Sequence, residues 1–264
     1  MDRVQKHACF PYFRSPSFRG RLSSVALAIG FGLMTFGGAH AQADACPAVK
    51  SAFDAKAANL VHLDSGPDRV LDILAIGSSS TEGVGASAPS RTYPAQLAEE
   101  LTHEDGIAAE VKNAGIGGEL AVKTLQRLKA ALKTARPELV IWQVGTNDAI
   151  VGVDEALFRA TVESGIAAVR AASVPLVLVG PQFSPKIPDV ARYQRFVAMV
   201  DEIGERLRVP VLSRYAMMKQ AGAKTLALLS GDGLHMSDLG YRCLARALAE
   251  EIEDASRPSV GAKL

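Results

Sequence analysis

Leu139–Gly145 reads LVIWQVG, a run of apolar residues that ends in glycine. A continuous apolar run of this length, bounded by turn residues, is typical of a strand buried on both faces of a sheet. Four other segments have the same character. The predicted strands are Val70–Gly77, Ala108–Gly115, Leu139–Gly145, Pro175–Gly180 and Val209–Ser213.

Amphipathic segments separate these strands. The predicted helices are Pro94–Glu104, Glu119–Ala135, Asp154–Ala172, Pro188–Leu207 and Ser237–Glu253, with an additional helix over Pro47–Leu60. Strands that alternate with helices predict βαβ units, and therefore an α/β fold with a five-stranded, mainly parallel sheet between two helical layers. We expect a single domain over 42–264 with its core at about 68–255.

The N-terminal segment has the features of a signal peptide. Basic residues precede an apolar run, Val25–Gly38, which is followed by the small-x-small sequence AHA at Ala39–Ala41. The run is shorter than the roughly 20 residues of a membrane-spanning helix. We expect cleavage after Ala41 (segment 1–41), a periplasmic or secreted protein and no membrane span after cleavage. Retention of the segment as an anchor is the alternative.

Cys46 and Cys243 are the two cysteines that remain after such cleavage. In an oxidising compartment they form a candidate disulfide between the mature N-terminus and the last predicted helix. The alternative is that both are small buried apolar residues.

Charge and composition exclude one class of partner. The formal net charge is +1, the basic excess lies before residue 42, and aromatic residues make up 6% of the chain. A slightly acidic body with few aromatic residues lacks the basic patch and stacking platform typical of nucleic-acid binding. We therefore expect no nucleic-acid partner.

Hydroxyl, glycine and amide groups follow the first three predicted strands. These segments are SSS (Ser78–Ser80), NAGIGGEL (Asn113–Leu120) and GTND (Gly145–Asp148). Ligands bind at the carboxyl edge of parallel sheets, so we expect the three loops to meet there. Small residues let a backbone N–H approach a ligand, and Asn147 offers a side-chain amide donor. The serines have another interpretation, as a helix cap.

A carboxylate and an imidazole lie before the last predicted helix. Asp232 and His235 are three residues apart in DGLH. In a turn, this spacing lets the carboxylate bind one ring nitrogen and leaves the other free as a base. An exposed turn is the alternative. The other two histidines of the mature chain, His62 and His103, lack such an arrangement. A hydroxyl, a base, a carboxylate and N–H donors are the groups that acyl transfer requires.

Motifs for two other chemistries fail. A phosphate-binding loop is not supported, because neither G-x-x-x-x-G-K-[ST] nor G-x-G-x-x-G is complete. The nucleophile elbow of α/β-hydrolases is excluded because the serine segment lacks the second glycine of G-x-S-x-G.

Four segments, in this order, resemble the signature blocks of the SGNH/GDSL family of hydrolases. They are GSS (Gly77–Ser79), NAGIGG (Asn113–Gly118), GTND (Gly145–Asp148) and DGLH (Asp232–His235), within a match over about Val70 to Glu253. The resemblance implies a flavodoxin-like α/β/α fold and a serine hydrolase that uses no metal and no cofactor. Ser78 stands where the family usually has Asp. That Asp is not a triad member, so the change concerns loop geometry.

The resemblance also implies a role for each site residue. Ser79 would be the nucleophile, His235 the base, and Asp232 the residue that orients the imidazole. The N–H groups of Ser79 and Gly118 and the side-chain amide of Asn147 would form the oxyanion hole.

Three neighbouring features have structural interpretations. We expect Asp148 to hold its loop by accepting backbone hydrogen bonds, and Trp142 to lie in the core. The segment GPQFSPKIPD (Gly180–Asp189) follows the fourth strand at the same edge, where it would shape a pocket.

The expected function is an esterase that acts on small or carbohydrate-linked esters. Alternatives are a lipid-directed lysophospholipase or acyl-thioesterase, an O-acyltransferase, and a non-catalytic binding protein on the same fold. Acyl-chain preference would separate the first two, and the intact residue set argues against the last. Family membership indicates the reaction type and leaves the substrate open.

Overall fold

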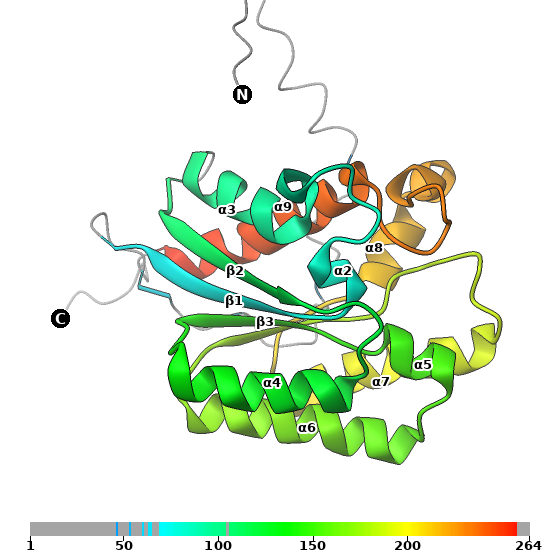
Figure 1. Ribbon diagram of the computed structural model, residues 1–264, viewed down its shortest axis with the longest axis horizontal. Helices are drawn as coiled ribbons and strands as arrows, with labels where there is room; N and C mark the ends of the chain where they lie inside the picture. Colours follow the sequence, from blue (N-terminus) through cyan, green and yellow to red (C-terminus); the bar gives the residue numbers. More distant parts are fainter. Residues whose placement is uncertain are drawn as a thin grey trace, which may run out of the picture. The chain divides into compact units, whose positions relative to one another are not determined.

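A parallel sheet with the strand order β2-β1-β3-β4-β5 forms the centre of the structure, a computed structural model (Figure 1). Its strands are β1 (Leu71–Gly77), β2 (Ala109–Gly115), β3 (Leu139–Gln143), β4 (Leu176–Val179) and β5 (Val211–Leu212). All four pairings between neighbouring strands are parallel. The five predicted strands are therefore confirmed, although the last is shorter than expected. Pro210, which has no N–H to donate, directly precedes it.

The structure describes Cys46, Phe53, Leu60, Leu63, Asp64, 69–103 and 106–257, all within one compact unit, Gly38–Leu264. The predicted signal peptide and His62 lie outside the described residues. The predicted helix over 47–60 also lies outside them, except at two positions. One of these, Phe53, pairs with Leu212 in an isolated antiparallel bridge.

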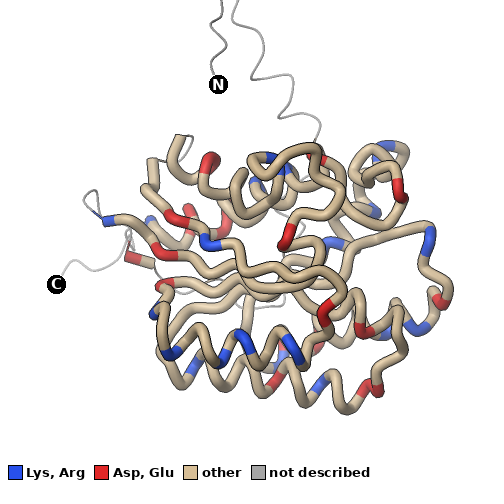
Figure 2. Tube along the Cα trace, viewed as in Figure 1, with Lys and Arg blue, Asp and Glu red and all other residues tan. Residues whose placement is uncertain are grey.

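Helices cover both faces of the sheet, as predicted for a three-layer α/β/α sandwich. One face carries α3 (Tyr93–His103) and α9 (Asp238–Ser256) (Figure 1). The opposite face carries α4 (Ala121–Thr134), α6 (Glu155–Ala171) and α7 (Val190–Leu207). Basic and acidic residues are interspersed along these helices (Figure 2).

Short helical segments lie in the loops and were not predicted, apart from the helix start that the cap interpretation of the serines implies. They are α2 (Ser79–Glu82), α5 (Thr146–Val151), α8 (Arg214–Gln220), η2 (Pro89–Arg91) and η3 (Gly222–Leu228). Each has two turns or fewer, or is a 3-10 helix, so none can show a sustained amphipathic period. Two of them, α2 and α5, begin directly at the predicted site.

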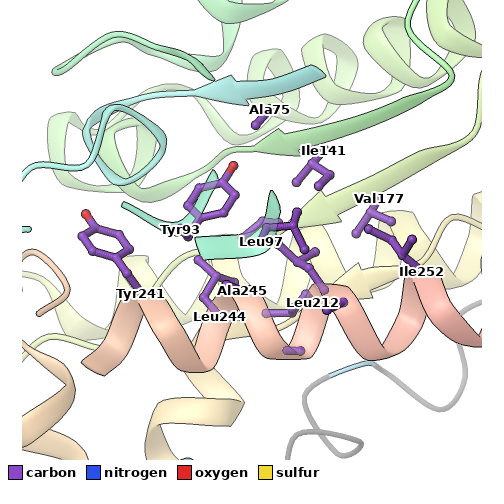
Figure 3. Close-up of a cluster of buried hydrophobic side chains, with 14 of the residues drawn as sticks. Ala75, Tyr93, Leu97, Ile141, Val177, Leu212, Tyr241, Leu244, Ala245 and Ile252 are labelled. Carbon is purple, nitrogen blue, oxygen red and sulfur yellow. The ribbon is translucent and has the colours of Figure 1, made fainter. Parts of the chain in front are cut away.

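The apolar side chains form two clusters, one on each face of the sheet. Ile73 and Ala75 of β1 point into the cluster under α3 and α9, which Figure 3 shows. Leu74 and Ile76 of the same strand point into the cluster under α4, α6 and α7. This alternation follows from the two-residue period of a strand. Burial of each large side chain contributes about 1.5–3 kcal/mol, which holds the sheet in a fixed place beneath the loops.

Trp142 of β3 lies fully in the second cluster, as expected. Its indole N–H donates to Thr124 Oγ1 at 3.0 Å, so the polar atom is satisfied in the core. Gly165 of α6 lies against the ring, since a Cβ at this position would be 2.0 Å from Trp142 Cζ3. The close contact fixes α6 on β3.

A disulfide joins Cys46 to Cys243, with 5.3 Å between the Cα atoms. The predicted pairing is therefore confirmed. Cys243 is fully buried in α9, so the bond holds the N-terminal part of the domain on the helix that follows the DGLH segment.

The strand order places a topological switch point between β1 and β3, at the carboxyl edge of the sheet. From β1 the chain moves outward to β2, and it then returns to place β3 on the other side of β1. In open α/β sheets, ligands bind where the strand order reverses in this way. The loops after β1 and β3 diverge at this point, and they carry Ser79 and Asn147.

Candidate active site

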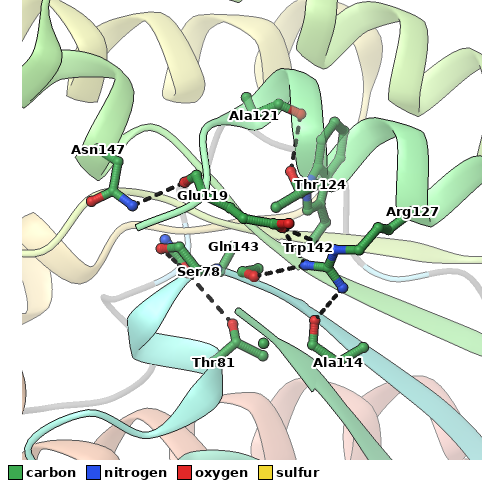
Figure 4. A network of polar contacts seen from close by, with 12 residues as sticks. Ser78, Thr81, Ala114, Glu119, Ala121, Thr124, Arg127, Trp142, Gln143 and Asn147 are labelled. Atoms are coloured by element: carbon green, nitrogen blue, oxygen red, sulfur yellow. Dashed lines mark hydrogen bonds and ion pairs between the residues drawn. The ribbon is translucent and has the colours of Figure 1, made fainter. Parts of the chain in front are cut away.

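Ser79 is the first residue of α2 and follows β1 after a single residue, Ser78. Both the N–H and the hydroxyl of Ser78 donate to Gln143 Oε1, at 2.8 and 3.0 Å. Gln143 is the last residue of β3 and is buried. The Ser78 N–H fixes the orientation of the Gln143 side-chain amide: the oxygen must face this donor, because the amide nitrogen could not accept its hydrogen bond. The turn before Ser79 is thus tied to the neighbouring strand (Figure 4).

Helix α2 lies directly against the end of β2. A Cβ at Gly115 would be 1.9 Å from the backbone nitrogen of Glu82, so only glycine permits this approach. The side chain of Asn113 adds two contacts: its oxygen accepts from Gly115 N at 2.9 Å and its amide donates to Glu82 O at 3.4 Å. The Asn and Gly of the NAGIGG segment therefore position the helix that carries Ser79.

Ser79, His235 and Asp232 form a hydrogen-bonded chain. His235 Nε2 lies 3.1 Å from Ser79 Oγ, and His235 Nδ1 lies 2.5 Å from Asp232 Oδ2. The residues come from two loops that are 156 positions apart in sequence. The structure thus brings together the three residues to which the resemblance gives catalytic roles.

The second carboxylate oxygen of Asp232 organises its own turn. Oδ1 accepts hydrogen bonds from Ser230 Oγ at 2.7 Å, Leu234 N at 2.8 Å and His235 N at 2.9 Å. Burial alone would raise the pKa of Asp232, but these bonds and the bond from His235 favour the charged form. The pKa of Asp232 therefore lies well below its usual range. A carboxylate that is charged at neutral pH and lies beside Nδ1 suits a base at Nε2.

The loop after β4 is hydrogen-bonded to the turn that carries His235. Ser184 Oγ donates to Gly233 O at 2.8 Å, and Gln182 Nε2 donates to Leu234 O at 3.2 Å. Gln182 is buried, and its oxygen accepts from Thr146 Oγ1 at 3.0 Å. The segment Gly180–Asp189 thus lies at the site, as expected, and there it links the loops after β3 and before α9.

The loop after β2 lies beside Ser79. A Cβ at Gly117 would be 3.9 Å from Ser79 Cβ, and the next residue, Gly118, has a left-handed φ of +76°. Asn147, which follows β3, contacts the same loop: its Nδ2 donates to Glu119 O at 2.9 Å. The amide nitrogen carries two hydrogens, so one remains for a ligand. The Ser79 N–H lies in the first turn of a helix, where N–H groups lack partners within the helix.

Asp148 holds the start of α4. Its Oδ1 accepts from Ala121 N at 3.0 Å, and Oδ2 lies 3.3 Å from the same nitrogen. The structural role that we expected for Asp148 is therefore confirmed. Burial raises the pKa of this carboxyl group, and backbone hydrogen bonds, the largest from Ala121, oppose that shift. Since Asp148 follows Asn147, the cap also fixes the position of the candidate oxyanion donor.

Several residues at the site were missed from sequence. Gln143 and Gln182 are buried amides inside otherwise apolar or proline-rich segments. A single polar residue in such a segment could have indicated a hydrogen-bonding role near the site. Glu82 gave no such signal. Its Oε2 would lie 2.7 Å from a Cβ at Gly117, so the carboxylate lies against the loop after β2. His103 is the last residue of α3, the helix that was predicted over Pro94–Glu104.

This arrangement joins a hydroxyl, an imidazole and a charged carboxylate by hydrogen bonds, and loops with N–H donors lie at the same edge of the sheet. These are the kinds of group that acyl transfer requires. Within the described ranges, no cluster of three His, Cys, Asp or Glu side chains could bind a metal ion. Among the helices that the structure describes, none is long and apolar enough to span a bilayer.

Comparisons with known proteins identify the family and the fold. A model of the Non-GDSL lipase-like family matches residues 45–258. Among curated proteins, Esterase TesA of Pseudomonas aeruginosa is 31% identical over 113 residues, or 43% of this chain and 55% of that protein. The chain thus aligns with about half the length of this curated relative.

Two solved structures are similar over most of the chain. A lipase/acylhydrolase from Enterococcus faecalis has a TM-score of 0.63 and 26% identity, over 72% of this chain and 99% of that one. A two-domain esterase (CEX) active on acetylated mannans has a TM-score of 0.59 and 24% identity, over 72% of this chain and 50% of that one. The second likeness shows a shared fold.

Proposed function

The chain belongs to the Non-GDSL lipase-like family, and on this premise we propose that it hydrolyses carboxylic esters through an acyl-enzyme on Ser79. The family and the solved esterases and lipases confirm the resemblance to SGNH/GDSL hydrolases. One observation carries the proposed reaction: the hydrogen-bonded chain from Ser79 through His235 to Asp232. The family's description also fits Ser78, which stands in place of the Asp of the GDS sequence.

In the proposed first half-reaction, Ser79 Oγ attacks the ester carbonyl while His235 Nε2 accepts its proton. The C–O bond to the alcohol breaks, and the imidazolium returns the proton to the leaving oxygen. In the second half-reaction, water attacks the acyl-enzyme with the same base, which releases the acid and Ser79. Asp232 holds the imidazole and stabilises its charged form throughout.

The oxyanion of the tetrahedral intermediate would be held by three donors. They are the N–H groups of Ser79 and Gly118 and the free amide hydrogen of Asn147. Support comes from their placement: Ser79 begins a helix, the loop of Gly118 lies beside Ser79, and Asn147 is fixed by Glu119 O. Donors that are fixed before the reaction need no reorganisation when charge develops.

The proposed substrates are small or carbohydrate-linked esters, with lipid esters and thioesters as the second class. Glu82 ends the short helix that Ser79 begins, and its carboxylate lies against Gly117, so its charge disfavours substrates with a negative charge near the reacting carbonyl. Transfer of the acyl group to another hydroxyl would use the same acyl-enzyme, so O-acyltransfer remains compatible with the site. A signal peptide over 1–41 and a periplasmic or secreted location are part of the proposal.

A chain-length series tests the proposal. The mature protein, 42–264, is assayed with p-nitrophenyl esters from acetate to palmitate, beside Ser79→Ala and the matched control Ser78→Ala. We expect hydrolysis that is lost in Ser79→Ala and retained in part in Ser78→Ala. A maximum at short chains supports small acyl groups, and a maximum at long chains supports lipids. Equal rates in wild type and Ser79→Ala would overturn the proposal.

A further inference from the structure

Arg127 of α4 reaches the carboxyl ends of two strands. Its Nη1 donates to Ala114 O of β2 at 2.7 Å, and its Nη2 donates to Gly77 O of β1 at 3.2 Å. Gly77 is two residues before Ser79, and Ala114 is four residues before Gly118. One guanidinium group therefore joins the starts of the two loops that carry these site residues (Figure 4).

The same guanidinium group binds Glu119 in the loop after β2. Arg127 Nε and Nη2 both donate to Glu119 Oε2, at 2.9 and 2.6 Å. The side chains are 27% and 18% exposed, so solvent screens this pair less than it screens an exposed ion pair. The planar guanidinium can make all four contacts at once, whereas the ammonium of a lysine has only three donors and no fixed fork.

Glu119 connects this cluster to the amide of Asn147. Its side chain binds Arg127, and its backbone carbonyl accepts from Asn147 Nδ2 at 2.9 Å. That bond determines which way the remaining amide hydrogen points. Gly118, the residue before Glu119, belongs to the same short loop. The orientation of two proposed oxyanion donors thus depends on where Glu119 is held.

We propose that Arg127 and Glu119 form a positioning pair, which clamps the loops after β1 and β2 and thereby aims the Asn147 amide and the Gly118 N–H at the oxyanion. This inference rests on the proposed function, because it assigns the pair to the same site. Neither side chain contacts Ser79 or His235 through a hydrogen bond among the described residues. The pair acts through Asn147 and the loop backbone.

The test compares Arg127→Met and Glu119→Gln with Arg159→Met. Arg159 also makes a bidentate ion pair, with Glu202 at 3.2 and 2.9 Å, but this pair joins α6 to α7, and among the described residues Arg159 makes no hydrogen bond to the site. Glu119→Gln keeps the backbone carbonyl and one side-chain acceptor, so it gives a folded variant if Arg127→Met fails to fold. Ester kinetics, affinity for a methyl alkylphosphonate anion, and hydrogen exchange of 114–120 are measured for each.

We expect kcat to fall roughly 10- to 100-fold in Arg127→Met, and less in Glu119→Gln, with KM changed less than about threefold, because a misplaced donor affects the transition state selectively. Affinity for the phosphonate anion should fall with kcat, and exchange in 114–120 should rise about tenfold. Arg159→Met should leave all three at wild-type values. Unchanged kcat with faster exchange would overturn the positioning role, as would unchanged exchange.

Failure of the proposed function gives a different result. In that case wild type itself shows no hydrolysis that depends on Ser79, whatever the state of the loop. The exchange and phosphonate measurements then still decide the clamp: faster exchange with weaker anion binding in Arg127→Met supports it, and wild-type values for both contradict it.

Discussion

At Asn147, one side-chain amide is proposed to serve two acceptors. One hydrogen is committed to Glu119 O, and the other is free for an oxyanion. The bond to Glu119 O therefore determines the direction of the other amide hydrogen. A residue with a single donor could do one of these tasks, but it could not be aimed and be available at the same time.

For Asn147→Ala we expect kcat to fall by roughly 10²–10³, the usual cost of one lost oxyanion donor. KM should change little, because the missing bond forms mainly in the transition state. The measurement is steady-state ester hydrolysis, with circular dichroism to show that the fold is intact. Undiminished turnover in a folded variant would remove Asn147 from the oxyanion hole.

Asp232 makes a pH-dependent contribution to stability. Its hydrogen bonds lower the pKa in the folded protein below the unfolded value, although burial opposes that shift. The stabilisation is therefore present above about pH 4 and is lost as the pH falls through the folded pKa. The stability difference between wild type and Asp232→Asn should be smaller at pH 3 than at pH 7 and pH 5.

Urea unfolding at these three pH values measures that difference. The Asn variant is the matched reference, because it keeps the shape of the side chain and does not titrate. A difference that grew as the pH fell would show that the carboxylate is not stabilised in the folded protein.

At the scale of elements, the helices α4 and α6 differ in where the residue that caps their N-terminus comes from. The start of α6 is capped by its own N-cap residue, since Asp154 Oδ1 accepts from Leu157 N at 2.9 Å. The start of α4 is capped from outside by Asp148, which belongs to α5. Only the second cap connects a helix to the loop of a proposed catalytic donor.

We expect Asp148→Ala and Asp154→Ala to lose similar stability, about 1–2 kcal/mol, because each leaves a helix N–H without its acceptor. Only Asp148→Ala should also lower kcat, since it releases both the start of α4 and the segment next to Asn147. Urea unfolding and ester kinetics measure the two effects. Equal kcat in both variants would separate the cap from the site.

The long elements could be predicted from sequence because their patterns are sustained. The buried strand around Trp142 is apolar almost throughout, and the amphipathic helix α7 follows the helical period over its whole length. By contrast, α2 has one turn, and its position depends on contacts with Gly115 and Gln143 from other strands. Such tertiary contacts leave no local pattern, so the serines could suggest a helix start but the position and length of α2 could not be predicted.

The site was predictable to a similar degree. Ser79, Asn147 and His235 were found because their segments resemble a family, and the sheet then brings the segments to one edge. The supporting residues Arg127 and Glu119 were not found. On the sequence they are ordinary charges on a helix and in a loop, and their role depends on carbonyl groups that only the folded β1 and β2 present.

At the scale of the whole molecule, the Cys46–Cys243 bond closes a loop of 197 residues. In the chain-entropy model, closure of such a loop stabilises the fold by up to about 5 kcal/mol, and measured values are often smaller. We expect Cys46→Ser to lower the free energy of unfolding by about 2–5 kcal/mol. We expect kcat to stay close to wild type, because the hydrogen bonds that hold the loops of Ser79 and His235 do not involve either cysteine.

Urea unfolding with and without dithiothreitol measures this effect. Reductant should destabilise wild type and leave Cys46→Ser unchanged. If reductant had no effect on wild type, the bond would not contribute to stability in solution.

The central claim is that Ser79, and not either neighbouring serine, is the nucleophile. The most direct test is to treat the mature protein with a fluorophosphonate and to locate the adduct by peptide fragmentation within Ser78–Ser80. The account predicts one adduct per chain, on Ser79, with loss of ester hydrolysis in proportion to labelling. An adduct on Ser78 or Ser80, or full labelling with activity retained, would contradict it.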